Sequence, residues 1–158
     1  MYARLRSFDE IQDSSIHARA LLIFERFAKE SRAVYTLSPA INGIGLIRGP
    51  AEATRRWLNV LQDPEPALVR YALGALGRTR DGSLFGPIGE LLKHRDEEVR
   101  FAAIGALGYL GILGDRRAIP MLVPLLADKT EAGEVDNHGP MQTVGDLAHE
   151  ALQKLEKV

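Results

Sequence analysis

Apolar residues recur along the chain at the spacing of one face of an α-helix. From Val99 they occupy positions i, i+3, i+4, i+7, i+8 and i+11, which is the stripe of an amphipathic helix. A segment that begins at Leu68, 31 residues earlier, follows the same pattern, and so does a segment that begins at Val144. The pattern predicts three helices with equivalent roles in one repeated arrangement.

Each of these three helices follows another segment with helical apolar spacing. The preceding segments cover residues 49–66, 81–98 and 115–129. Turn-forming residues such as Asp63 and Pro64 stand between the two helices of a pair. No long stretch alternates between apolar and polar residues, so the sequence predicts an all-α chain built from helix–turn–helix units.

The helical pairs resemble a known repeat family. The segments "LQDPEPALVRYALGALG" (61–77) and "LLKHRDEEVRFAAIGALGYLG" (91–111) resemble HEAT repeats, in particular the short HEAT-like repeats first associated with phycobilisome lyases. The resemblance extends over residues 49–158 and implies a right-handed α-solenoid, which this family uses mostly as a binding scaffold. The chain departs from the family pattern in its arginines, because Arg100 is present but Gly145 takes the equivalent place in the last unit.

We expect one domain, residues 1–158, with about three HEAT-like hairpins behind an irregular helical N-terminal cap. The cap, or degenerate repeat, covers residues 1–48, and the repeats cover 49–80, 81–114 and 115–158. The last repeat contains an inserted loop, 129–143, and a final helix with a polar outer face. A terminal repeat of a solenoid requires such a polar face, so this helix is expected to close the array.

The N-terminal third is less regular. Residues 14–32 carry a broad apolar helical face, and Ser38 followed by Pro39 predicts the start of a short second helix. The region also holds half of the aromatic residues: Tyr2, Phe8, Phe24, Phe27 and Tyr35. It is interpreted as a cap of the array or as a surface for self-association.

Glycine recurs inside two of the predicted helices, at Gly74, Gly77, Gly105 and Gly108. Each costs roughly 1 kcal/mol relative to alanine in a helix interior. Close packing of neighbouring helices explains such a cost, and so does a partner that approaches the backbone.

The second helices of the pairs offer the best candidate for a binding surface. We expect a non-catalytic scaffold or adaptor that binds a protein partner there. An aromatic side chain beside arginines is typical of an interface hot spot. The candidate residues are Arg70, Gly74, Arg100, Phe101, Gly105 and Tyr109. If Phe101 and Tyr109 were fully buried, this surface would be core instead.

Three further functions are compatible with the sequence. The resemblance allows a bilin-lyase-like subunit or accessory protein of an enzyme, although no bilin-handling group of residues is recognised. A nucleic-acid-binding solenoid is the second, but acidic residues interleave with the many arginines and the net charge is −1. The third is an immunity or regulatory protein that blocks one partner.

The remaining sequence features assign no catalytic, cofactor-binding or metal-binding residue. The chain has no cysteine, which excludes disulfides and thiolate metal sites. "GIGLIRG" (43–49) lacks the preceding strand that a nucleotide-binding loop needs. Acidic and imidazole groups gather around the inserted loop, but their spacing matches no metal motif. The sequence shows no signal peptide and no membrane span, so we expect a cytoplasmic protein.

Overall fold

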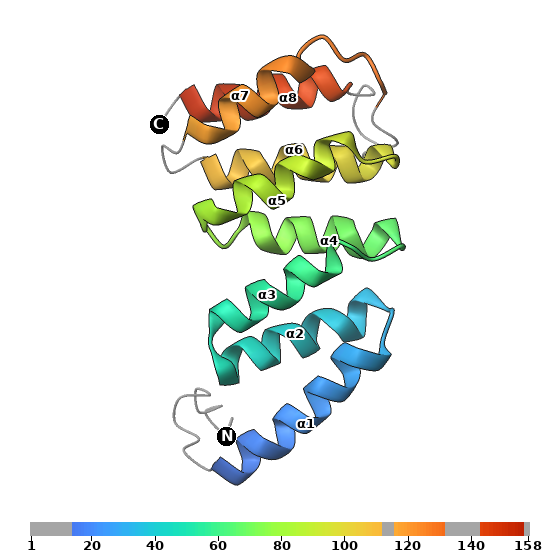
Figure 1. The fold of residues 1–158 in the computed structure, drawn as a ribbon, viewed down its shortest axis with the longest axis vertical. Coiled ribbons are helices and arrows are strands. Elements are labelled where there is room, and N and C mark those ends of the chain that lie inside the picture. The colour runs from blue at the N-terminus through green and yellow to red at the C-terminus, as the bar shows by residue number, and fades with distance from the viewer. Residues whose placement is uncertain (1–13, 112–115, 132–142, 157–158) are drawn as a thin grey trace, which may run out of the picture. The chain divides into compact units, whose positions relative to one another are not determined.

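The chain folds into helices throughout the part that the structure describes. The computed structural model describes residues 14–111, 116–131 and 143–156, and every regular element within these ranges is an α-helix or a short 3-10 helix (Figure 1). The all-α prediction is therefore confirmed. The chain separates into two compact units, Met1–Arg56 and Trp57–Val158, and the boundary falls inside helix α3, Pro50–Val60.

The first unit is built around a hairpin of two helices. Helix α1, Ser14–Glu30, packs against α2, Val34–Arg48. The ring of Phe24 lies directly over Gly43, where a Cβ atom would collide with it. The core side of α2 presents an apolar stripe of Leu37, Ala40, Ile41 and Ile44, all buried. Burial of this stripe holds the hairpin together.

The start of the second helix was predicted wrongly. Ser38 and Pro39 do not begin α2, because the helix starts at Val34 and Pro39 lies inside it. The backbone of Ala33 is extended, and its carbonyl accepts hydrogen bonds from the amides of Thr36 (3.1 Å) and Leu37 (2.9 Å). The buried stripe continues past the proline, so packing outweighs the hydrogen bond that Pro39 cannot donate.

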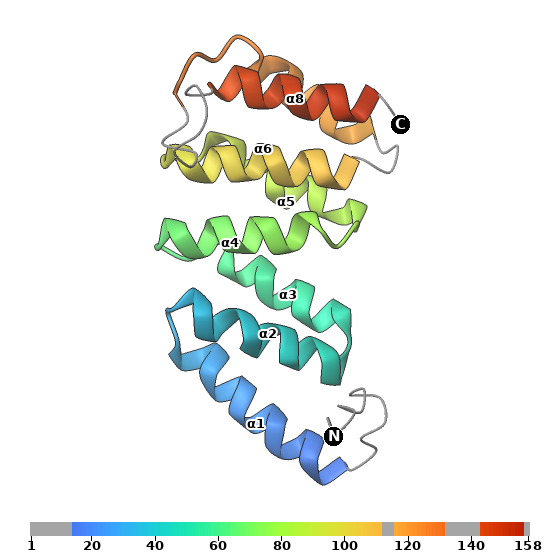
Figure 2. The same cartoon turned by 180° about the vertical axis from the view of Figure 1, so that it is seen from behind.

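The second unit repeats one arrangement along the chain. Its long helices are α4, Pro66–Gly77, α6, Glu97–Gly111, and α8, Val144–Glu156. They lie side by side and run in the same direction, with α6 between the other two (Figure 2). In α6 the predicted stripe is buried at Val99, Ala103, Ala106, Leu107 and Leu110.

The helices that precede α6 and α8 are short and broken into α and 3-10 turns. Those before α6 are η2, Gly82–Leu84, α5, Phe85–Glu90, and η3, Leu91–Lys93; those before α8 are η4, Arg116–Ala118, α7, Ile119–Leu122, and η5, Val123–Leu125. Both segments contain proline, which lacks an amide donor and favours such breaks.

Close helix packing explains two of the four glycines in the "GALG" segments of α4 and α6. A Cβ atom at Gly77 would lie 2.9 Å from Ala106 Cα and 3.2 Å from its carbonyl oxygen. A Cβ atom at Gly108 would lie 3.3 Å from Ala151 Cβ. The second glycine of each "GALG" segment therefore allows one long helix to approach the next.

Candidate functional site

The first glycine of each "GALG" segment faces open space. A Cβ atom at Gly105 would have no neighbour within 4 Å, and one at Gly74 would meet only Arg78 Nη1, at 4.0 Å. Alanine fits both positions and is the better helix former by roughly 1 kcal/mol. Gly86 is also open, but it precedes Pro87, and that position disfavours helical backbone for other residues. Packing therefore does not explain Gly74 and Gly105.

Two aromatic side chains flank Gly105 on α6. Tyr109 is 60% exposed, and Phe101 is half-buried. The three residues are spaced by four, so they share one helix face. Neither aromatic residue is fully buried, so this face is a surface and not part of the core.

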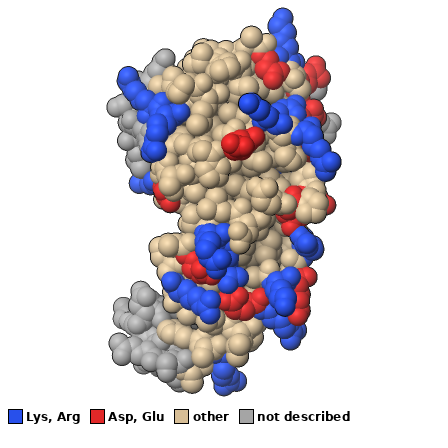
Figure 3. Space-filling model, viewed as in Figure 1, with Lys and Arg blue, Asp and Glu red and all other residues tan. Residues whose placement is uncertain are grey.

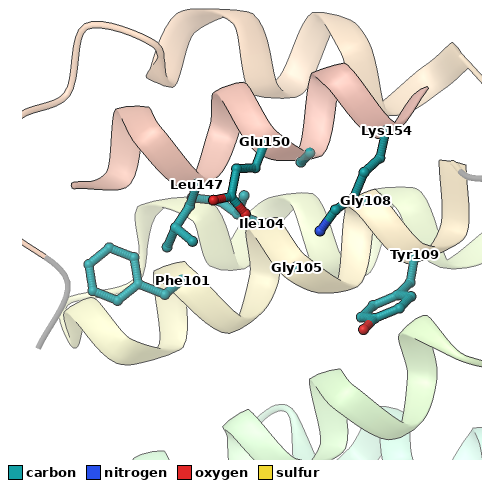
Figure 4. Close-up of a pocket in the computed structure, with 9 residues that line it drawn as sticks. Phe101, Ile104, Gly105, Gly108, Tyr109, Leu147, Glu150 and Lys154 are labelled. Atoms are coloured by element: carbon teal, nitrogen blue, oxygen red, sulfur yellow. The ribbon is translucent and has the colours of Figure 1, made fainter. Parts of the chain in front are cut away.

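This face forms one wall of a hollow between α6 and α8 (Figure 4). The hollow has a volume of about 90 Å³ and is lined by Phe101, Ile104, Gly105, Gly108, Tyr109, Leu147, Glu150, Ala151 and Lys154. Ile104 and Ala151 are buried and make an apolar floor, while the charged ends of Glu150 and Lys154 lie at the rim. Small-molecule pockets usually enclose about 300–1,000 Å³. The size of this hollow suits one apolar side chain.

The two predicted arginines are engaged within the second unit. Arg70 of α4 forms an ion pair with Glu98 of α6, and both side chains are partly exposed. Arg100 donates hydrogen bonds from Nη1 to the carbonyl oxygens of His94 (2.9 Å) and Arg95 (3.3 Å). The guanidinium of Arg100 thus provides hydrogen-bond donors for two backbone carbonyl groups in the turn before α6.

The same turn region affects a carboxylate in the next repeat. Hydrogen bonds from the Thr130 side chain and amide lower the pKa of Asp128, and the charge of Arg100 lowers it further. The Thr130 hydroxyl donates to Asp128 Oδ1 at 2.6 Å. Arg100 therefore also interacts electrostatically with the following repeat.

The structure brings three of the six predicted residues into one site. Phe101, Gly105 and Tyr109 line the hollow, while Gly74 and Arg70 lie on the neighbouring helix α4. Sequence reasoning missed the contribution of α8, which it treated as a polar cap. Its residues Leu147, Glu150, Ala151 and Lys154 complete the hollow. The contribution of α8 could have been predicted from the apolar stripe that it shares with α6, because this stripe indicates that the two helices pack in the same way.

One residue of the predicted α4 stripe is partly exposed. Tyr71 is 40% exposed, and its ring lies 5.6 Å from that of Trp57, measured between centroids, at an angle of 40°. Trp57 is buried, so Tyr71 covers it from the surface side. Tyr71 therefore extends the aromatic character of the face onto α4.

Arginines of the first unit are held in an ion-pair network. Arg56 contacts Glu25 at 2.8 Å and Glu52 at 2.9 Å, and Arg48 contacts Glu25 at 3.0 Å. Hydrogen bonds from Arg55 and Arg56 lower the pKa of Glu52 from 4.5 to about 2. On the face shown in Figure 3, positive and negative side chains are interspersed. These contacts give Arg48, Arg55 and Arg56 a structural role within the first unit.

The N-terminal aromatic residues divide into two groups. Phe24 packs on Gly43, whereas Phe27 is 41% and Tyr35 is 90% exposed. The remaining two, Tyr2 and Phe8, lie outside the described residues. On α1, Ile16 and Ile23 are also exposed and share a face with Phe27.

No group of three or more possible metal ligands occurs in the described ranges. Glu134, Asp136 and His138 of the inserted loop lie outside these ranges, whereas Asp146 and His149 lie on α8. Asp146 accepts hydrogen bonds from the Thr143 amide and hydroxyl, each at 2.8 Å, which lower its pKa. Asp146 thereby provides a hydrogen-bond acceptor for the backbone amide of Thr143, which directly precedes α8. Within the same ranges, no helix is long and apolar enough to cross a membrane.

A comparison with family models identifies the repeats of the chain. The family model described as HEAT repeats matches residues 54–135, more than half of the chain. The matched segment contains α4, α5 and α6 completely, together with most of α3 and all of α7. No curated protein matches the sequence.

Proposed function

Because the chain belongs to the HEAT-repeat family, we propose that it is a non-catalytic scaffold that binds a protein partner. The binding surface is the exposed side of α4, α6 and α8, which we call the second-helix face. It includes Tyr71, Gly74, Phe101, Gly105, Tyr109, Leu147 and Lys154, together with the flanking Arg70 and Arg78. The observation that supports this proposal is the open position of Gly105 between two aromatic side chains that are both at least partly exposed.

A glycine without a packing role lowers the stability of its helix, and no contact within the protein compensates for this loss. At Gly105 the missing side chain leaves the backbone of α6 accessible beside the hollow. A partner side chain that enters the hollow gains roughly 1.5–3 kcal/mol from burial if it is the size of leucine or phenylalanine. Aromatic walls that reach the surface around such a position are typical of an interface anchor.

The proposal is tested by filling the hollow from inside. Gly105→Trp places a large side chain over the floor, and Glu90→Trp adds the same side chain at an exposed position on α5 as a matched control. A photo-reactive phenylalanine analogue at Phe101 is used to crosslink partners in lysate of the source cell. We expect one protein to be crosslinked in stoichiometric amounts, to persist with Glu90→Trp and to disappear with Gly105→Trp. Equal crosslinking in both variants would contradict the proposal.

We also propose that the first unit supports self-association through α1. The observation in favour is the exposed apolar stripe of Ile16, Ile23 and Phe27, which α2 leaves uncovered. Such a stripe is typical of a helix that packs against another chain.

An enzyme accessory role and an inhibitory role each have a distinct signature. A lyase-like accessory protein would bind a tetrapyrrole and show its visible absorbance. An immunity or regulatory protein would inhibit the activity of one tightly bound partner. Both tests use the same purified chain.

A further inference from the structure

We propose that the partner of the second-helix face presents an acidic peptide segment, with a bulky apolar side chain that enters the hollow and a nearby carboxylate that contacts Arg78 or Lys154. This inference rests on the proposed function and specifies the chemistry of the partner. It follows from the charges that surround the hollow.

Two cations stand at the same edge of the second-helix face. Arg78 is the C-cap residue of α4, and its Nη1 atom reaches to 4.0 Å from the Cβ position of Gly74. Lys154 lies in the last turn of α8 and lines the hollow. The three long helices run in the same direction, so their C-terminal ends lie along one edge (Figure 2).

Tyr109 lies between these two cations. It occupies the last turns of α6, the helix between α4 and α8. Neighbouring helices pack about 8–10 Å apart, so a peptide that crosses α6 at Tyr109 comes within reach of a long side chain from either neighbour. The lysine side chain projects from α8 toward α6 in Figure 4.

Both cations are available for a partner. Arg78 and Lys154 are exposed, and neither forms an ion pair with a carboxylate in the part of the chain that the structure describes. By contrast, Arg70 on the same face is already paired with Glu98. Arg78 and Lys154 therefore offer positive charge at the C-terminal edge, while Glu150 lies one helical turn earlier on α8. A carboxylate next to an apolar anchor complements this arrangement.

The same face disfavours nucleic acid. Glu98 and Glu150 interrupt the cations along the face, so a phosphate backbone that crosses the face meets carboxylates, whereas a single partner carboxylate at the C-terminal edge lies one helical turn beyond Glu150. The hollow has an apolar floor and suits an aliphatic or aromatic side chain. A peptide satisfies both the apolar and the charged parts of the site.

Peptide selection tests this inference with the full-length chain. Random dodecapeptides displayed on phage are selected on the wild-type protein, and the enriched clones are measured against three variants. Arg78→Glu/Lys154→Glu reverses the two cations. Lys93→Glu/Lys129→Glu reverses two exposed lysines elsewhere and is the matched control. Gly105→Trp fills the hollow, and circular dichroism verifies that all variants fold.

We expect the clones to combine a bulky apolar residue with Asp or Glu a few positions away. Reversing the two cations should weaken their binding about tenfold, whereas the control reversal changes it little. Gly105→Trp should abolish binding. Clones that need the hollow but show no acidic preference would overturn the acidic assignment and leave the proposed function standing.

Two other results would contradict the peptide partner itself. If no clones are enriched, or if they bind Gly105→Trp as well as wild type, both the inference and the proposed function fail. Short labelled duplex DNA and single-stranded RNA are measured in parallel. Binding of either that is lost with Arg78→Glu/Lys154→Glu and retained in the control would assign the cations to phosphate and refute the peptide partner.

Discussion

Replacing Gly105 by alanine should stabilise the protein, whereas the same replacement at Gly77 should destabilise it. Both glycines belong to a "GALG" segment, but Gly105 lies in the interior of α6, whereas Gly77 is the last residue of α4, so helix propensity alone predicts a gain at Gly105 and a smaller gain at Gly77. Their surroundings differ. A methyl group at Gly105 meets no atom within 4 Å, while one at Gly77 lies 2.9 Å from Ala106 Cα.

The expected magnitudes follow from these contacts. Gly105→Ala gains about 0.5–1 kcal/mol in the free energy of unfolding, because alanine loses less backbone entropy in the helix. In a chain of this length, that gain raises the melting temperature by about 1–4 °C. Gly77→Ala gains less from helix propensity because Gly77 ends α4, and α4 and α6 must separate, so overpacking costs about 1–3 kcal/mol. The net effect is a loss of up to about 3 kcal/mol.

Urea unfolding measures both variants with one probe. Trp57 is the single tryptophan, is buried, and belongs to the same unit as the two glycines, so its fluorescence reports their effect. Gly105→Ala should also weaken partner binding, because its methyl group narrows the hollow. If both variants shift the urea midpoint in the same direction, the distinction between a packed and an open glycine is refuted.

Three further predictions concern other contacts. Gly145→Ala should lower the free energy of unfolding by about 1–3 kcal/mol in urea titrations, because its Cβ would lie 2.7 Å from the Leu126 carbonyl oxygen and 3.0 Å from that of Asp128; an unchanged midpoint would contradict this. Glu52 has a pKa lowered from 4.5 to about 2, so its ion pairs stabilise the first unit above the unfolded pKa and are lost as the pH falls toward 2. The stability difference between wild type and Glu52→Gln should therefore shrink on acidification, and a constant difference would refute the assignment. Ile23→Glu should abolish concentration-dependent self-association in sedimentation equilibrium, and a wild-type chain that stays monomeric at all concentrations would rule out the α1 interface.

The periodicity of apolar residues predicted the long helices of the second unit well. The stripe that begins at Val99 is buried except for the half-buried Ala102, because α6 lies between α4 and α8 and has neighbours on both sides. The equivalent stripe in α4 fails at Tyr71, whose ring covers Trp57 at the surface. A large amphipathic side chain satisfies the helical spacing whether it is buried or lies across a neighbour.

Capping and proline signals predicted helix boundaries less reliably where tertiary packing outweighs them. Ser38 and Pro39 form a standard helix start, yet the apolar stripe of α2 passes through them. At the candidate site, the sequence identified the aromatic and glycine positions on α6 but gave no way to separate open glycines from packed ones. That distinction depends on which helix lies opposite, as the contrast between Gly105 and Gly108 shows.

The connection before α8 has a consequence for engineering this protein. Glu131 and Thr143 form an isolated antiparallel bridge, and the amides of Val144 and Gly145 each donate, at 2.9 Å, to carbonyl oxygens just before it. Glu131 and Thr143, the two ends of this connection, are therefore held next to each other. The cost of closing a loop grows only slowly, by about 0.6 kcal/mol for each doubling of its length. We therefore expect the protein to tolerate a reporter domain or an affinity peptide inserted between Glu131 and Thr143 with little loss of stability.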